Sequence, residues 1–211
     1  MSTQDSGASS DVDLVGVALL PDVTVAAAVV EFARRWDLGF GGYGLDGTRV
    51  LPHVSLHQVR TAAVSAMVDR IAATPMAAPG STRLQDLVLQ PPDWMFLTVE
   101  TLPWMVAMQS ELVGSLEPFV RKDLLKPSDE LVGYGPAELR SYRRHGYRYV
   151  GDAFLPHFTL GRSAEPDGAF PVGCREDFDA ELRDLAVQFT RLVVFRAAAH
   201  GTIGEIVFSR G

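Results

Sequence analysis

Hydrophobic and polar positions follow one another in blocks that predict short strands separated by helices. Residues 14–20 form an apolar run with strand character, and Pro21 with Asp22 ends it. The alanine-rich residues 23–38 are a predicted helix, and a glycine stands directly after its end, where glycine is common. An extended segment at 49–59 and a second predicted helix at 61–77 follow.

A second series of elements repeats this order. It comprises predicted strands at 84–90 and 95–100, a helix at 101–120, a long polar loop at 121–150, a strand at 153–161, a helix at 178–188, and closing strands at 192–197 and 205–208. The order strand, helix, histidine strand, helix, strand therefore occurs twice. That pattern predicts a duplicated α+β unit whose two lobes face each other.

The chain of 211 residues is long enough for one domain with a sizeable core. Residues 1–10 are small and polar and predict a disordered tail. We expect residues 11–211 to form a single bilobal domain with approximate halves 11–93 and 94–211.

A hexapeptide occurs twice, once in each predicted half. Residues 51–56 read Leu-Pro-His-Val-Ser-Leu, and residues 155–160 read Leu-Pro-His-Phe-Thr-Leu, 104 positions later. A histidine followed two places on by a hydroxyl residue is common by accident. The same six-residue pattern in both halves of a duplicated chain is not.

The spacing of two residues has a geometric meaning only on a strand. Alternate strand side chains point to one face, so His53 lies with Ser55, and His157 lies with Thr159. On a helix, residues two apart diverge. Each motif alone fits a core histidine whose hydroxyl neighbour satisfies it, but the matched pair favours a shared site with two imidazoles and two hydroxyls.

Two H-x-[ST]-Leu motifs, one per half of a chain of this size, resemble the 2H phosphoesterase superfamily, which includes 2′-5′ RNA ligase-like proteins and cyclic nucleotide phosphodiesterases. The second motif and its tail, which run from His157 to Arg162, are especially similar. The resemblance implies an α+β bilobal fold with a pseudo-two-fold axis, two antiparallel sheets facing a central cleft, and helices outside. It also implies chemistry on a 2′,3′-cyclic phosphate or a related 2′-5′ linkage, without a metal or other cofactor.

Hydrolysis of a cyclic phosphodiester needs a base to activate water and an acid to protonate the departing ribose oxygen. Histidine, with an ordinary pKa of about 6.5, serves either role near neutral pH, so His53 and His157 are the candidate catalytic residues. Ser55 and Thr159 are candidates for binding the phosphate oxygens, and Arg162 adds a cation there.

Two features depart from the family pattern. His57 adds a third imidazole beside the first motif, and we expect it at the rim of the cleft as a further candidate for substrate binding. The predicted loop at 121–150 is the second departure, and we expect it to narrow or redirect the cleft. Residues 140–149 are strongly basic and interleaved with tyrosines, and they lead into the second motif. Guanidinium groups suit phosphates and tyrosines stack on bases, so this segment predicts a substrate clamp whose candidates are Tyr142, Arg143, Arg144 and Arg148. The alternative is a solvated surface loop.

The composition limits the classes of ligand and partner that we expect this protein to bind. The net charge of −7 and the isoelectric point near 5.2 argue against a broad grip on duplex DNA and favour a small nucleotide or an RNA terminus. A single cysteine excludes an internal disulfide framework. No secretory signal and no apolar run of about 18 residues is present, so we expect a cytoplasmic protein without a membrane partner. We also expect a monomer.

Three other kinds of functional site, a dinucleotide-binding loop, a metal site and a serine nucleophile, agree less well with the sequence. Residues 39–44 match G-x-G-x-x-G, but a helix precedes them and an extended segment follows, the reverse of the dinucleotide-binding context. His53 and His57 lie about 13 Å apart on a strand, too far to share a metal ion. No serine sits in a G-x-S-x-G elbow. Two functional alternatives remain open: a module that binds RNA ends or cyclic nucleotides without turnover, and an RNA-joining enzyme.

Overall fold

The computed structural model describes residues 12–38, 44–91, 93–127, 130–163, 165 and 169–211. The predicted tail and most of the glycine-rich segment lie outside these residues. The helices and strands, in chain order, are β1 (Asp13–Pro21), α1 (Val23–Arg35), β2 (Val54–Thr61), α2 (Val64–Ala73), β3 (Ser81–Gln90), β4 (Trp94–Val99), α3 (Pro103–Leu116), α4 (Pro136–His145), β5 (His157–Arg162), α5 (Cys174–Glu181), β6 (Ala186–Ala197) and β7 (Ile203–Arg210).

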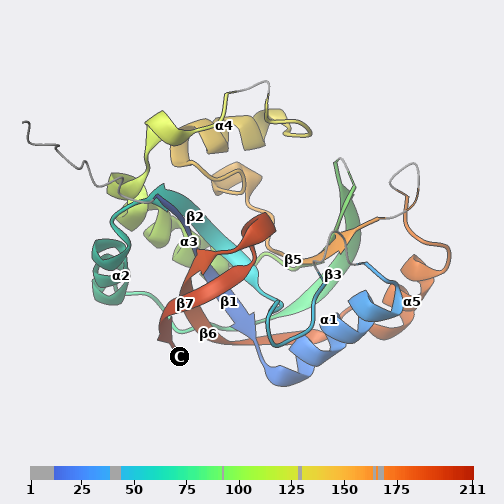
Figure 1. Ribbon diagram of the computed structural model, residues 1–211. Helices are drawn as coiled ribbons and strands as arrows, with labels where there is room; N and C mark the ends of the chain where they lie inside the picture. The colour runs from blue at the N-terminus through green and yellow to red at the C-terminus, as the bar shows by residue number, and fades with distance from the viewer. Residues whose placement is uncertain (1–11, 39–43, 92, 128–129, 164, 166–168) are drawn as a thin grey trace, which may run out of the picture.

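The strands form two antiparallel lobes. One lobe contains β2, β1, β6 and β7, and the other contains β5, β4 and β3. The β2–β5 and β3–β6 pairings join the lobes, so that the order β1-β2-β5-β4-β3-β6 closes back on β1. Helices α2 and α3 cover the first lobe, and α1 and α5 lie outside the second (Figure 1). The predicted α+β class with antiparallel strands and outer helices is confirmed, and the two predicted sheets are the two lobes of one seven-stranded sheet.

The strand registers reveal an approximate two-fold axis. Val54 of β2 pairs with Phe158 of β5, and these are equivalent positions of the two hexapeptides. Thr82 of β3 likewise pairs with Val187 of β6. The axis therefore passes through both pairs, and it relates β1-α1-β2-α2-β3 to β4-α3-β5-α5-β6. Each lobe takes its third strand from the other half of the chain, because β3 pairs with β4 while β6 pairs with β1.

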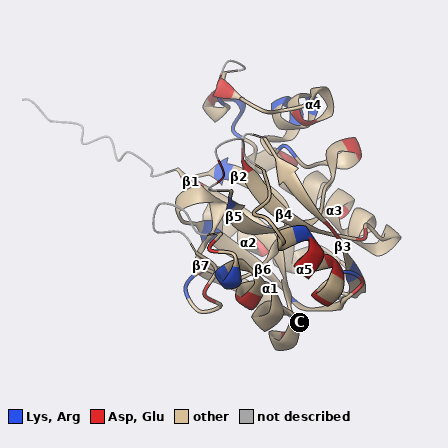
Figure 2. Cartoon of the chain, turned by 90° about the vertical axis from the view of Figure 1, so that its right-hand side faces the viewer, with Lys and Arg blue, Asp and Glu red and all other residues tan. Residues whose placement is uncertain are grey.

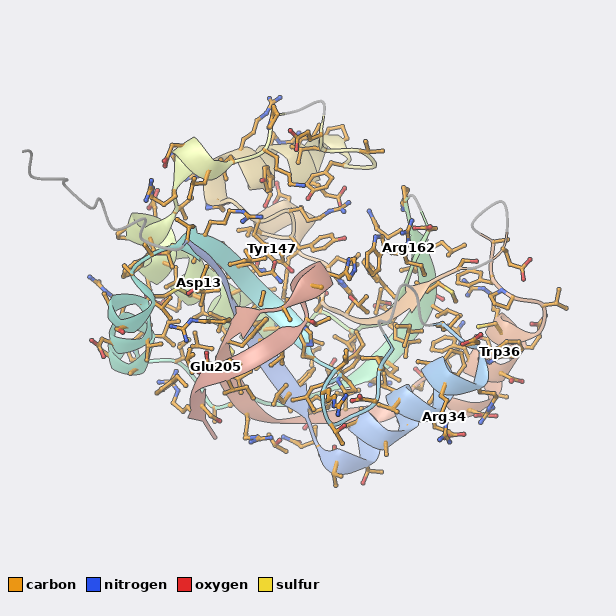
Figure 3. The ribbon with its side chains drawn as sticks, viewed as in Figure 1. Asp13, Arg34, Trp36, Tyr147, Arg162 and Glu205 are labelled. Carbon is orange, nitrogen blue, oxygen red and sulfur yellow. The ribbon has the colours of Figure 1, made fainter. Side chains whose placement is uncertain are left out.

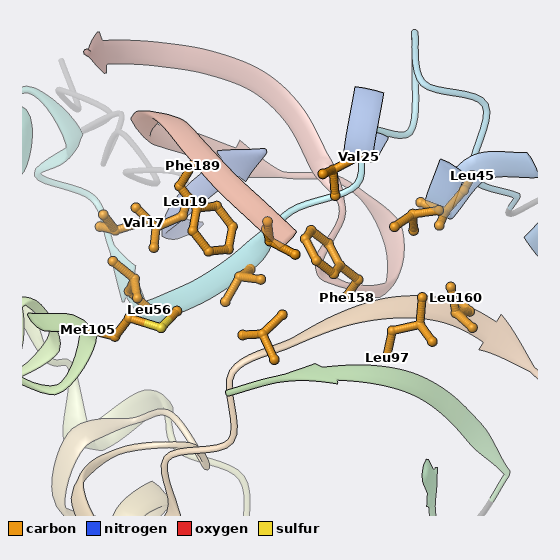
Figure 4. Close-up of a cluster of buried hydrophobic side chains, with 14 of the residues drawn as sticks. Val17, Leu19, Val25, Leu45, Leu56, Leu97, Met105, Phe158, Leu160 and Phe189 are labelled. Atoms are coloured by element: carbon orange, nitrogen blue, oxygen red, sulfur yellow. The ribbon is translucent and has the colours of Figure 1, made fainter. Parts of the chain in front are cut away.

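One apolar core serves both lobes. Side chains that alternate inward along the strands, such as Leu56 on β2 and Phe158 on β5, meet residues of β1, β4, β6 and the helices (Figure 4). Each fully buried large apolar side chain contributes on the order of 2 kcal/mol of stability. Helix α1 begins where the Asp22 carboxylate accepts bonds from the backbone N–H groups of Thr24 and Val25, at 2.8 and 3.0 Å.

Both histidine strands contain a bulge at the same place. Ala18 pairs with Ser55 but Val17 pairs with His57, which leaves Leu56 as an extra residue. In β5 the equivalent extra residue is Leu160. A bulge shifts the alternation of the strand, so Gln58 rather than His57 continues the cleft-facing row that His53 and Ser55 begin.

Several predicted boundaries are wrong. Residues 121–150 are not a continuous loop, because they contain α4, whose first turn is closed by the Gly135 N–H donating to Glu138 at 2.7 Å. Its sequence is strongly polar and contains few apolar residues, so the hydrophobic pattern alone predicts a loop there. The helix predicted at 178–188 ends at Glu181, and residues 186–188 begin β6 because they pair with β3. The strand predicted from residue 153 begins at His157.

The glycine of the second motif tail is a sensitive position. Gly161 has φ +153°, and a Cβ there would stand 1.4 Å from the Leu38 carbonyl oxygen. We expect Gly161→Ala to lower the free energy of unfolding by at least about 2 kcal/mol, because backbone must move to make room. Gly114→Ala is the control: a Cβ on this residue of α3 meets nothing within 4 Å, and alanine should stabilise the helix by about 0.5–1 kcal/mol. Denaturant titration of both variants checks the pair, and equal stabilities would contradict the close approach.

Candidate active site

The two histidine motifs meet at one hollow between the lobes, with a volume of about 180 Å³. Its wall combines β2, β4 and β5 with the segment after α4 and with the turn between β6 and β7. The lining residues are His53, Ser55, Gln58, Trp94, Phe96, Tyr147, Arg148, Tyr149, His157, Thr159, His200, Gly201 and Thr202. The structure thus brings together both predicted imidazoles and both predicted hydroxyls.

Each imidazole is oriented by the backbone two residues before it. His53 Nδ1 lies 2.9 Å from the Leu51 carbonyl oxygen, and His157 Nδ1 lies 2.6 Å from the Leu155 carbonyl oxygen. A carbonyl oxygen can only accept, so Nδ1 carries the proton and donates in both rings. The neutral tautomer therefore has its lone pair on Nε2 in each case, and the two-fold relation extends to this hydrogen bond.

Aromatic rings pack against both imidazoles and shield them in part from water. The His157 ring stacks on Phe96, with centroids 3.7 Å apart and planes 16° apart, and Tyr149 meets it edge-on at 5.1 Å. His53 meets Phe195 edge-on at 5.5 Å. The hydrogen bonds to the carbonyl groups orient the imidazoles, and these ring contacts hold them in the same positions.

Burial lowers the pKa of both catalytic candidates. It lowers the pKa of His157 from 6.5 to about 4, with further lowering by the charges of His53 and Arg148 and partial opposition from the Leu155 carbonyl. Burial also lowers the pKa of His53, against the effect of its Leu51 bond. Both rings are therefore neutral at pH 7 in the free protein.

Two tyrosines from the segment after α4 complete the wall. The Tyr147 hydroxyl shares a hydrogen bond with the Ser55 side chain, and Tyr147 lines the hollow. Figure 3 shows this residue between α4 and the strands of the first lobe. The Tyr149 hydroxyl is buried and has no hydrogen-bond partner among the described residues. Burial raises the pKa of both phenols, so they stay protonated and can donate. An unsatisfied buried donor in a polar hollow suits a ligand oxygen.

Arg148 is the member of the predicted clamp that reaches the hollow. Its guanidinium binds Glu138 at 2.8 Å, and both side chains are largely buried, 14% and 15% exposed. It also lies 3.9 Å above the Tyr134 ring. A paired and stacked guanidinium is held in one place, which suits it to a fixed role in binding.

The other predicted clamp residues lie elsewhere. Arg143 and Arg144 are exposed on α4 and do not line the hollow, and Arg144 borders a separate surface depression beside residues 151–153. Tyr142 is buried, and its hydroxyl accepts the Lys126 backbone N–H at 3.0 Å. Arg162 does not line the hollow either: its Nε donates to Asp93 at 2.6 Å, and its guanidinium lies near the Trp94 ring.

His57 is not at the rim of the cleft. It is 1% exposed, packs edge-on against Tyr147 at 5.9 Å, and has no partner for either ring nitrogen among the described residues. Burial, followed by the charge of His145, lowers its pKa to about 3. The bulge at Leu56 is the reason, because it interrupts the regular alternation on which the rim position depended.

The sequence does not predict several of the residues that line the hollow. Trp94 and Phe96 lie on the neighbouring strand and carry no motif, and His200 comes from the turn before β7. Tyr147 and Tyr149 are recognisable from the sequence as candidates, because they flank Arg148 at a spacing of two residues, which is typical of a strand. Among the described residues no cluster of three or more histidine, cysteine or acidic side chains could hold a metal ion. In the same part of the chain no helix is both long and apolar enough to cross a membrane.

Solved structures share this fold, although no protein-family model and no curated protein matches the sequence. Protein TT0787 of Thermus thermophilus is 19% identical, with a TM-score of 0.59 over 93% of this chain and 96% of that one. E. coli LigT complexed with 3′-AMP is 16% identical, with a TM-score of 0.51 over 95% and 98%. A structure described as a phosphoesterase is 12% identical, also with a TM-score of 0.51 over 95% and 98%. The resemblance that the two hexapeptides indicate is thereby confirmed in the architecture, and the chain has the fold of the 2H phosphoesterase superfamily.

Proposed function

We propose that this protein is a phosphodiesterase that hydrolyses a 2′,3′-cyclic phosphate or a related 2′-5′ linked nucleotide, with His53 and His157 as a metal-independent acid–base pair. The observation that carries the proposal is the matched orientation of the two imidazoles. Both donate from Nδ1 to a carbonyl two residues earlier, and both line one hollow. Structures of E. coli LigT with phosphate and with 3′-AMP support a nucleotide ligand for this fold.

The chemistry needs one imidazole in each protonation state. The neutral ring accepts a proton at Nε2 from water as the water oxygen bonds to phosphorus. The protonated ring gives its Nε2 proton to the ribose oxygen as the phosphorus–oxygen bond to that oxygen breaks. The product is a phosphomonoester with a free ribose hydroxyl. Because the two rings are related by the pseudo-two-fold axis, the orientation of the substrate decides which histidine is the acid.

Donors around the imidazoles would stabilise the charge on the non-bridging oxygens. Ser55 and Thr159 lie on the same strands as the histidines, and the Tyr149 hydroxyl is available for a ligand oxygen. Arg148 supplies a fixed positive charge. Arg162 takes no part in these contacts, because it forms an ion pair with Asp93 outside the hollow.

Removal of either imidazole tests the acid–base pair. We expect His53→Ala and His157→Ala each to lower kcat by at least about a hundredfold, the usual contribution of such a group. His145→Ala is the matched control, since this imidazole does not line the hollow and its loss should leave kcat within about twofold. Assays with 2′,3′-cyclic nucleotides in the presence of a chelator measure the effect. A folded variant of either catalytic residue with normal turnover would refute the mechanism, and loss of wild-type activity on chelation would refute its metal independence.

Tyr149→Phe separates activity from stability. The variant keeps the ring beside His157 and removes a buried hydroxyl that has no partner among the described residues. We expect kcat to fall by roughly 10- to 100-fold, the value of a hydrogen bond to a charged oxygen, while the free energy of unfolding stays equal or rises. Steady-state kinetics and denaturant titration measure the two quantities. Unchanged kcat would assign the hydroxyl no part in the reaction.

The lowered histidine pKa values predict an acidic optimum. The active form carries one proton on the pair, and burial holds the pKa of His157 near 4 and that of His53 below 6.5 in the free protein. Deprotonation of the acid therefore removes activity as pH rises, and kcat/KM should peak below pH 6.5 and fall about tenfold per pH unit above its optimum. Bound phosphate favours the imidazolium, so the kcat profile should be displaced to higher pH. A kcat/KM that still increases through pH 8 would contradict this assignment.

A further inference from the structure

A second hollow adjoins the two-histidine site. Its volume is about 380 Å³, twice that of the first, and the two hollows share the side chains of Gln58, Trp94, Tyr147 and Arg148. Pockets for nucleotide-sized ligands usually measure about 300 Å³ or more, so the histidine hollow alone is small for such a molecule. A substrate whose reacting group lies between the histidines can continue past these shared residues.

The second hollow has cations available for an anion. Arg60 and Lys126 line it, and neither side chain forms an ion pair among the described residues. Arg148 also lines it, but Glu138 neutralises that guanidinium. Glu130 is the acidic lining residue, so the unpaired cations exceed the acidic groups by one. This excess is unusual in a chain whose net charge is −7 and whose acidic residues gather in part on α5 (Figure 2).

Aromatic side chains form part of the remaining wall, beside apolar residues such as Leu131 and Val132. Trp94 and Tyr134 line the second hollow, and Tyr134 meets Tyr142 edge-on at 5.8 Å. Rings of this kind are the usual stacking partners of nucleic-acid bases, whose identity matters little to the contact. An anion site next to aromatic walls fits a phosphate that carries a nucleoside.

Arg60 lies along β2 from the histidine motif, at some distance from the reacting phosphate. Ser55 lines the first hollow and Arg60 the second, and because Leu56 between them is the extra residue of the bulge, the strand advances by about four regular steps, roughly 13 Å. Arg60 lies two residues beyond Gln58 and so shares its face. The strand therefore leads from the chemical site to the cations.

We propose that the second hollow binds a second phosphate of the same substrate together with its nucleoside. The reacting cyclic phosphate is then the end of a longer molecule, and Arg60 and Lys126 determine specificity for that length. The second phosphate belongs either to an internucleotide linkage or to a pyrophosphate. This proposal rests on the proposed function of the two-histidine site.

Substrates of different length test the subsite. The probes are adenosine 2′,3′-cyclic phosphate, a dinucleotide that ends in a 2′,3′-cyclic phosphate, and ADP-ribose cyclic phosphate. We expect kcat/KM of the wild type to be at least about tenfold higher for one of the longer substrates, the value of one charged contact. The double variant Arg60→Gln, Lys126→Gln should lose that preference through a higher KM, with its turnover of the mononucleotide unchanged. The longer substrate that shows the effect identifies the linkage.

Arg191→Gln is the matched control, because this exposed arginine of β6 lines neither hollow and its loss removes one positive charge. It should change no substrate preference. Equal kcat/KM for short and long substrates, or an equal loss on all three in the double variant, would overturn the proposal.

A binding measurement keeps the two proposals distinguishable. Calorimetric titration of the His157→Ala variant with adenosine 3′-phosphate and with a dinucleotide 3′-phosphate needs no turnover. Tighter binding of the dinucleotide, abolished by Arg60→Gln with Lys126→Gln, would support the subsite even if no cyclic phosphate were hydrolysed, in which case the proposed function alone would fail. Equal affinities would overturn the subsite.

Discussion

The two histidine strands are neighbours over one residue pair, Val54 with Phe158, and the geometry of the site depends on that short pairing. It lies on the pseudo-two-fold axis, so each imidazole stands one residue away from the axis on its own strand. Beyond this pair the strands separate, and each pairs instead with β1 or β4. The hollow opens where they part, with an imidazole and a hydroxyl on either side.

The two lobes are held together because each contains one strand from the other half of the chain. Because β3 belongs to the lobe of β4 while β6 belongs to the lobe of β1, neither sheet can form without both halves of the chain. The shared apolar core has the same consequence, since α1 packs on β5 and α3 packs on β2. A site that requires two imidazoles at a fixed separation benefits from such a frame, in which the lobes cannot move apart without exposing the core.

The site itself is costly to the folded state. Burial of His157 costs stability only below about pH 6.5, where the unfolded chain is protonated at this ring; because its pKa is lowered from 6.5 to about 4, its protonation in the folded state is roughly 3 kcal/mol less favourable than in water. The Tyr149 hydroxyl and both nitrogens of His57 are buried without partners among the described residues. Tyr147, Arg148 and Tyr149 follow α4, an element with no counterpart among the described residues of the other half, so the site is asymmetric although its two motifs are related by symmetry. Because the site is asymmetric, the two possible orientations of a bound substrate differ in binding free energy.

The sequence by itself determined the repeated order of elements, the strand identity of the two motifs, and the four side chains His53, Ser55, His157 and Thr159, because an alternation of two is local and needs no knowledge of distant contacts. Tertiary structure decided what depends on register and on neighbouring strands. The bulge at Leu56 buried His57, and pairing with β3 turned residues 186–188 from a predicted helix into strand. Arg143 and Arg144 differ little from Arg148 as sequence, yet only Arg148 lies past the end of α4, where the chain turns back over the hollow. A side chain contributes to a site through where its backbone is held, and for these residues long-range pairing sets that position.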